Sequence, residues 1–247
     1  MTQDRHAELG TILGVFAHPD DEAYSAGGLM TEAVDAGRRV VCVTATRGEQ
    51  GFPETDRRSL AERAALREGE LAKCLATLGV TEHHWLDYRD GEGDRVDVAE
   101  AVAAVADLIA DVRPDTVLTF GPDGMTGHVD HVAVSRWTTL AFRRAAPASA
   151  RLLYMTQSRE WNDRFMGSMD ASRVMMVEGM TMPAVEPEDL AVWFRLDDEL
   201  ADRKVAALRC QASQVERLRE ELGADAYREM VREEFFRAAG DDDWRET

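Results

Sequence analysis

The sequence has 247 residues, of which 45% are hydrophobic, and this is enough for one globular domain with a sizeable core. It carries 47 acidic residues against 29 basic ones, so its formal net charge is −18. That charge repels polyanions at long range, and we therefore exclude nucleic acid and an acidic membrane surface as partners.

The cysteines and the first residues bear on the compartment. Cys42, Cys74 and Cys210 are far apart and form no Cys-x-x-Cys pair, a pattern typical of free thiols in a reducing compartment. The first ten residues lack the basic start and apolar core of a secretory signal. No segment approaches the roughly 18 uninterrupted apolar residues of a membrane span. We therefore expect a cytoplasmic protein without a membrane partner.

The first half of the chain alternates apolar runs with stretches of helical periodicity, which is typical of a βαβ series and a parallel sheet. Glycine or proline follows each of the first three predicted helices. In chain order, the pattern predicts a strand at 11–17, a helix at 22–36, a strand at 39–46, a helix at 59–78, a strand at 83–88, a helix at 97–112, a strand at 115–120 and a helix from about Val129.

The second half has weaker signals. They predict a strand at 151–156, an irregular segment at 170–189, a strand at 190–196, and helices at 198–220 and 225–238. No repeat, linker or low-complexity tract divides the chain. We therefore expect an α/β fold with a mostly parallel sheet and helices on both faces. It should form a single domain over 1–247, in which 141–247 completes the sheet, a pocket wall and the terminal helices.

Histidine and acidic residues follow two of the predicted strands. The segment HPDDE at 18–22 comes directly after the first strand, and the segment HVDH at 128–131 comes shortly after the fourth. In an open parallel sheet, ligands bind beyond the carboxyl ends of the strands. The sequence thus places both segments at one rim, as a metal site assembled by tertiary folding requires.

The residue types at this rim suit a hydrolytic metal centre. Zinc in hydrolases typically takes three protein ligands and leaves one position open for water. His18, Asp21 and His131 would form such a set. Two histidines and one carboxylate also suit Fe²⁺, so zinc is the expected cofactor and ferrous iron its alternative.

Three neighbouring residues have candidate catalytic roles. Asp20 adjoins a metal ligand in the sequence and is the candidate base that takes a proton from water. His128 could hydrogen-bond the oxyanion and protonate a departing amine, while Asp130 orients one of the imidazoles. The alternative is purely structural, because acidic residues at a strand-to-helix turn are commonly helix caps. Two such motifs at equivalent strand ends favour the metal site.

The same motifs carry a family resemblance over residues 11 to about 140. AHPDDE followed by GG, then TRGEQG, then GHVDH is similar to the PIG-L/LmbE-like family of metal-dependent N-acetylglucosaminyl deacetylases. The resemblance implies a Rossmann-like fold and zinc on the three ligands named above. It also implies Asp20 as the general base and His128 as the group that stabilises the tetrahedral intermediate, with Asp130 beside it.

Softer matches concern the substrate. Arg67 falls where family members carry a substrate-contacting arginine, and Asp90 where an acidic residue can meet sugar hydroxyls; Glu49 is a further candidate for the pocket lining. The alternatives are a solvated helix-face arginine and a turn aspartate. Val129 stands where family members often have proline, and Thr126 where some deacetylases of thiol biosynthesis have tyrosine. Val129 should change local stiffness and leave the chemistry intact, whereas with Thr126 the resemblance does not imply the same substrates as those enzymes have.

The leading hypothesis is a zinc-dependent amidohydrolase that cleaves the acetamide of an N-acetylglucosamine-type sugar or glycoconjugate. Its small-molecule partner would be an acylated amino sugar, and its products acetate and a free amine. One rival is an amidase that cuts a larger amide in a thiol conjugate or natural-product intermediate. Another is a non-catalytic protein that only binds a metal or a sugar.

Two features leave their use open. The late helices carry apolar stripes that would suit a homo-oligomer. A group of methionines could wall an adaptable apolar pocket for an acyl or aryl group, or could simply pack: Met175, Met176, Met180 and Met182.

Overall fold

The strands form one sheet in a computed structural model that describes residues 9–166, 174–241 and 243. The order in this eight-stranded sheet is β3-β2-β1-β4-β5-β8-β7, with β6 paired to β5. Strands β1 to β5 run parallel, and β8 runs antiparallel to both β5 and β7. The strands are β1 Ile12–Phe16, β2 Val40–Thr46, β3 Glu82–Tyr88, β4 Thr116–Phe120, β5 Arg151–Ser158, β6 Ala184–Val185, β7 Val192–Arg195 and β8 Glu233–Ala238.

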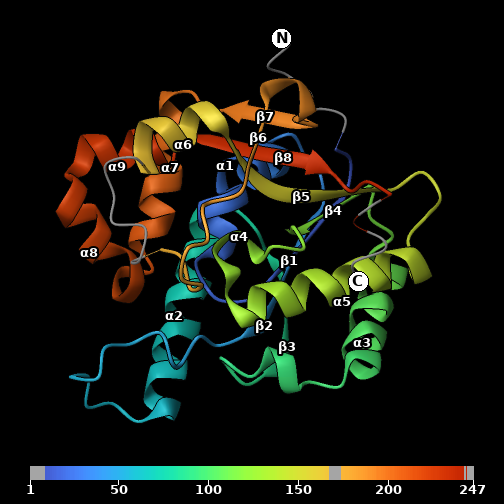
Figure 1. Ribbon diagram of the computed structural model, residues 1–247, viewed down its shortest axis with the longest axis horizontal. Coiled ribbons are helices and arrows are strands. Elements are labelled where there is room, and N and C mark those ends of the chain that lie inside the picture. The colour runs from blue at the N-terminus through green and yellow to red at the C-terminus, as the bar shows by residue number, and fades with distance from the viewer. Residues whose placement is uncertain (1–8, 167–173, 242, 244–247) are drawn as a thin grey trace.

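Helices cover both faces of the sheet. Figure 1 shows α3 and α5 packed together on one side, and α1, α2 and α7 together on the other. The helices are α1 Asp21–Asp35, α2 Leu60–Leu78, α3 Val98–Val112, α4 Gly124–Gly127, α5 Val129–Ala145, α6 Arg159–Phe165, α7 Asp198–Arg209, α8 Ala212–Leu222 and α9 Ala224–Met230. The expected α/β fold with a mostly parallel sheet is confirmed.

The central strands are apolar because they have no solvent face. Every residue of β1, β2 and β4 is buried, as expected for parallel strands covered by helices on both sides. The predicted strands and helices of the first half are confirmed, with bounds that differ by one residue at most. Local signals set these bounds. For example, a reciprocal Ser59–Glu62 capping box starts α2, and Gly79 with φ +82° ends it.

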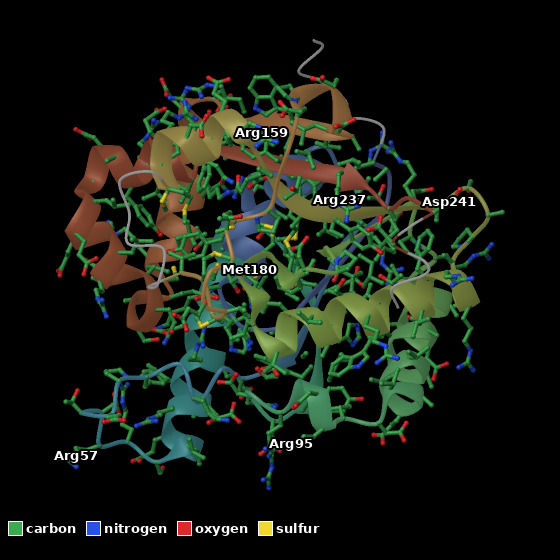
Figure 2. All side chains as sticks on the ribbon, viewed as in Figure 1. Arg57, Arg95, Arg159, Met180, Arg237 and Asp241 are labelled. Carbon is green, nitrogen blue, oxygen red and sulfur yellow. The ribbon has the colours of Figure 1, made fainter. Side chains whose placement is uncertain are left out.

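The prediction of a helix at 225–238 is wrong. The chain forms the short helix α9 and then β8, which fills the space between β5 and β7. Phe235 stacks on Trp193 of β7, and Arg237 lies over Tyr154 of β5, 4.9 Å from the ring centroid (Figure 2). Packing on two neighbouring strands thus outweighs the helical preference of this charged segment.

The helix predicted at 198–220 is interrupted. α7 ends at Arg209 and α8 begins at Ala212, with Gln211 buried between them. Gln211 Nε2 donates to Glu22 Oε1 at 2.6 Å, so this break ties the late helices to α1. The irregular segment predicted at 170–189 lies partly outside the described residues, and its described part contains the short strand β6. No described helix is long and apolar enough to cross a membrane.

Candidate metal centre and the two cavities beside it

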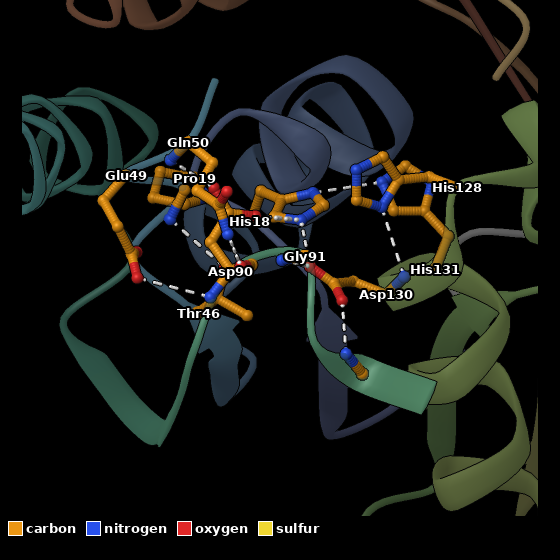
Figure 3. A network of polar contacts seen from close by, with 12 residues as sticks. His18, Pro19, Thr46, Glu49, Gln50, Asp90, Gly91, His128, Asp130 and His131 are labelled. Atoms are coloured by element: carbon orange, nitrogen blue, oxygen red, sulfur yellow. Dashed lines mark hydrogen bonds and ion pairs between the residues drawn. The ribbon is translucent and has the colours of Figure 1, made fainter. Parts of the chain in front are cut away.

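The sheet brings the two predicted segments together. β1 and β4 are parallel neighbours, so the residues that follow them emerge at the same edge. His18 follows β1, and His131 lies in the first turn of α5, which β4 reaches through α4. Figure 3 shows the imidazoles of His18 and His131 facing one another across this edge.

Three side-chain donors form a compact triangle. His18 Nδ1 lies 3.2 Å from His131 Nε2. The Asp21 carboxylate completes the triangle, with Oδ1 3.4 Å from His131 Nε2 and Oδ2 3.6 Å from His18 Nδ1. Ligands about 2.0–2.1 Å from a tetrahedral zinc ion lie roughly 3.3–3.4 Å apart. These pairwise separations are close to those of ligands that share one divalent ion.

The outer nitrogens of both rings are already engaged. His18 Nε2 bonds to Asp130 Oδ2 at 2.9 Å, and His131 Nδ1 bonds to the Gly124 carbonyl at 3.0 Å. Each acceptor is an oxygen, so each of these nitrogens carries its proton. The two inner nitrogens then face each other with lone pairs unless a proton or a cation lies between them. Such outer partners are what orients histidine ligands in zinc sites.

Backbone groups hold the carboxylates behind His18. Asp130 accepts N–H bonds from Gly91 at 2.7 Å and Gly93 at 2.8 Å. Asp90 Oδ1 lies 3.1 Å from His18 Nε2, and its other oxygen accepts the Gln50 N–H at 2.6 Å. The imidazole that Asp130 contacts is thus that of His18. Asp90, expected at sugar hydroxyls, also supports this ring.

The electrostatics of the centre favour a positive charge. Burial lowers the pKa of His18, but its hydrogen bonds to Asp130 and Asp90 and the charge of Asp21 outweigh burial and raise the pKa to about 10. Burial lowers the pKa of His131 to about 4, so this ring is neutral near pH 7. In the protein alone, protonated His18 supplies the positive charge. A metal cation between the same donors would replace that proton.

Asp20 stands beside this triangle in an unusual conformation. Its backbone has φ +103°, which is costly for a residue with a side chain and is found mainly at functional sites. Its carboxylate lies 3.4 Å from Arg67 Nη2. Burial raises the pKa of Asp20 above its usual range, and the charge of Arg67 opposes this. Arg67 also donates to the carbonyls of Pro19 and Gly48, so it fastens the loops around Asp20.

His128 caps α5 and lies against the same centre. Its Nδ1 accepts the Asp130 N–H at 3.2 Å, and its ring is nearly perpendicular to that of His18 with centroids 4.7 Å apart. Donor atoms of His18, His128 and His131 lie within 4.8 Å of one another. His128 is therefore a further candidate ligand, although Asp21 closes the tighter triangle.

Two cavities meet at the triangle, and Asp20, Asp21, Thr126 and His131 line both. The polar cavity, of about 480 Å³, has further walls from His18, Gln50, Arg67, Asp90, His128, Met176 and Gln214. The apolar cavity, of about 360 Å³, extends in the direction of β5 and β8. The centre is thus open to ligands of two different characters.

Some residues differ from their expected places. Glu49 does not line either cavity; its Oε1 accepts the Asp90 N–H at 3.3 Å and so supports that loop. Gln50 and Gln214 line the polar cavity without having been predicted. Gln50 lies within the TRGEQG motif and could have been found there. Gln214 comes from α8, and no local pattern marks it.

A profile of the GlcNAc-PI de-N-acetylase family, PIG-L, matches residues 13–142. The chain is 33% identical over 232 residues to a 1D-myo-inositol 2-acetamido-2-deoxy-alpha-D-glucopyranoside deacetylase of Acidothermus cellulolyticus, which covers 83% of this chain and 80% of that protein. It is 36% identical over 171 residues to the protein of the same description from Kineococcus radiotolerans. That alignment covers 57% of this chain and only 46% of the relative.

The fold also resembles a solved structure. The N,N'-diacetylchitobiose deacetylase from Pyrococcus horikoshii superposes with a TM-score of 0.65 at 22% identity. The superposition covers 96% of this chain and 86% of the other. At this identity, the likeness concerns the fold alone.

Proposed function

This chain belongs to the PIG-L family of GlcNAc-PI de-N-acetylases, and from this premise we propose that it is a zinc-dependent hydrolase of N-acetylated amino sugars. It would remove the acetyl group from an N-acetylglucosamine-type sugar or glycoconjugate and release acetate and a free amine. The observation that carries the proposal is the triangle of His18, Asp21 and His131 donors, placed beside a carboxylate at the meeting point of two cavities.

His18, Asp21 and His131 would hold the ion. When bound, it supplies Lewis acidity that polarises an amide carbonyl and acidifies water. Asp130 and Asp90 keep the His18 ring in the tautomer that presents Nδ1 to the centre. Ferrous iron suits the same donors, and elemental analysis of protein purified without added metal distinguishes the two.

Asp20 is the proposed general base. Its carboxylate adjoins the triangle and borders both cavities, so it can take a proton from water that attacks the carbonyl carbon. Collapse of the tetrahedral intermediate needs a proton on the amide nitrogen, which Asp20 or His128 delivers. His128 lies edge-on against the His18 ring and can hydrogen-bond the oxyanion through Nε2, because its Nδ1 is taken by the helix cap.

The polar cavity is the proposed sugar site. Arg67, Asp90, Gln50 and Gln214 border it and offer both donors and acceptors to hydroxyl groups. The acidic surface and the free cysteines support a small-molecule partner and a cytoplasmic location, which we include in the proposal. We further propose that the described residues work as one domain, since β5, β7 and β8 extend the sheet begun by the family-matched segment.

The test is acetate release by the metal-loaded protein from a panel of N-acetyl sugars, with Asp20→Asn as the comparison. We expect turnover by the wild type and a loss of about 10²- to 10⁴-fold in the variant, with metal content unchanged. Full activity of Asp20→Asn would refute the assigned base. Absence of any acyl-sugar hydrolysis by metal-loaded wild type would favour the rival binding-only function.

A further inference from the structure

The apolar cavity has a hydrocarbon and thioether lining. Its walls come from α1, β4, β5, α8, α9 and β8, together with single residues such as Val174. The large apolar side chains in its lining include Met155, Met166, Met182, Leu218, Met230 and Phe235. Methionine side chains adapt their shape to flexible apolar ligands. Met180, labelled in Figure 2, belongs to the adjoining segment, and a Cβ placed on Gly127 would lie 2.7 Å from its sulfur.

Most polar side chains at this cavity are bound to the protein itself, with the exception of Gln157, whose buried Oε1 has no hydrogen-bond partner. Glu234 accepts the N–H groups of Gly28 and Leu29 and pairs with Lys204 Nζ at 2.7 Å. Trp161 Nε1 donates to the Met230 carbonyl at 3.0 Å. A sugar placed here would lose its hydrogen bonds to water and regain few of them, and this is costly. The cavity therefore suits an apolar group.

The two sides of an amide bond indicate which part of the substrate would occupy each cavity. The carbonyl carbon carries the sugar nitrogen on one side and the acyl group on the other. If the sugar occupies the polar cavity and the carbonyl lies at the donor triangle, the acyl group points into the apolar cavity, because both cavities share Asp20, Asp21 and His131.

The apolar cavity is larger than an acetyl group requires. An acetyl group places a single methyl beyond the carbonyl, whereas this cavity has about 360 Å³. That volume is within the range of roughly 300–1,000 Å³ that holds whole small ligands.

We propose that the apolar cavity is an acyl site that accepts unbranched chains longer than acetyl, so that amino sugars N-acylated with a medium-length fatty acid are hydrolysed in addition to the N-acetyl compounds and with higher kcat/KM. This inference depends on the proposed function. Water adds its hydroxyl to the acyl carbon and its proton to the nitrogen as the C–N bond breaks, which gives a fatty acid and the free amino sugar.

The experiment is a chain-length series with the full, metal-loaded protein. The substrates are N-acetyl-, N-butanoyl-, N-hexanoyl- and N-octanoylglucosamine, together with the octyl glycoside of N-acetylglucosamine, and the readout is amine release. We expect kcat/KM to rise about two- to fourfold per methylene of the acyl chain until the cavity is filled. A preference for acetyl, or a gain with the octyl glycoside in place of the acyl chain, overturns the inference but leaves the proposed function standing. No hydrolysis of any of these substrates overturns both.

Filling the cavity provides the second test. Ser25 on α1 and Leu218 on α8 both line it, so Ser25→Phe and Leu218→Trp take up its volume from two directions. In each variant, we expect the octanoyl-to-acetyl ratio of kcat/KM to fall by about tenfold or more. Ser149→Phe, at an exposed position before β5, is the matched control. Metal content and melting temperature report whether each variant folds. An unchanged ratio in a folded, metal-bound variant overturns the inference.

Discussion

Asp130 on α5 accepts a hydrogen bond from His18 Nε2 at 2.9 Å and thereby fixes which nitrogen of that ring faces the centre. Asp130→Asn keeps the shape but replaces the carboxylate by an amide that no longer stabilises the imidazole in this tautomer. We expect zinc affinity to fall about 10- to 100-fold, measured by competition with a chromophoric chelator.

The matched control for that change is Asp94→Asn, which alters an exposed aspartate in the neighbouring loop. Its zinc affinity should equal that of the wild type. Equal affinities for all three proteins would show that Asp130 does not orient a ligand.

Removing the metal should destabilise the protein. A ligand that binds only the folded state at 100 times its Kd contributes about 2.7 kcal/mol, which for a chain of this size corresponds to roughly 5–10 °C in Tm. We expect a chelator to lower the Tm by this amount, and excess zinc to restore it. In Asp21→Ala, which lacks one proposed ligand, the chelator should change the Tm little. A chelator effect of full size in that variant would exclude Asp21 as a ligand.

The backbone conformation of Asp20 should lower the free energy of unfolding. With φ +103°, this residue occupies a region that glycine adopts readily, so Asp20→Gly should stabilise the metal-free protein by about 1 kcal/mol while abolishing turnover. Urea unfolding with a chelator present measures the effect. Asp20→Asn removes the same charge but retains a side chain, so it should lack the backbone gain. Equal stabilities of the two variants would contradict stored strain at this position.

The half-buried ring of His83 should make stability depend on pH. Burial lowers its pKa to about 4 from 6.5, with the charge of His84 contributing. The unfolded chain therefore binds more protons between these values, and stability is lost as the pH falls from 6.5 to 4. His83→Gln should reduce this loss by roughly 1–3 kcal/mol in unfolding experiments at both pH values. His84→Gln removes the neighbouring charge that contributes to this shift but leaves the His83 ring in place, so it should reduce the loss by less than His83→Gln does. Identical pH profiles for His83→Gln and wild type would contradict this linkage.

The parts of the site that follow from short sequence patterns were predictable. His18, Asp20 and Asp21 directly follow a buried strand, and His131 follows its parallel neighbour, so strand direction alone places them at one edge. The same reasoning set the bounds of the first-half elements, since glycines, caps and apolar runs are local signals. The assignment of roles to these residues is a proposal that the variants above test.

The parts that depend on distant packing were not predictable. The segment EEFFRA is rich in charge and has no strict alternation, and it forms β8 only because β5 and β7 flank it. Gln214 and Leu218 reach the two cavities because Gln211 interrupts the helix before them and bonds to Glu22 on α1. No window of the sequence contains both partners of that contact.

The antiparallel insertion of β8 has a consequence for biosynthesis. All three proposed ligands have been translated by the end of α5, and β5 follows them. One edge of β5 and one wall of the apolar cavity then still await residues Glu233–Ala238. Until that hexapeptide emerges, the nascent chain carries an unpaired strand edge that invites intermolecular association. A fragment ending at residue 142 would instead leave the edge of β4 unpaired permanently, because it contains the donors without β5 and the strands beyond it.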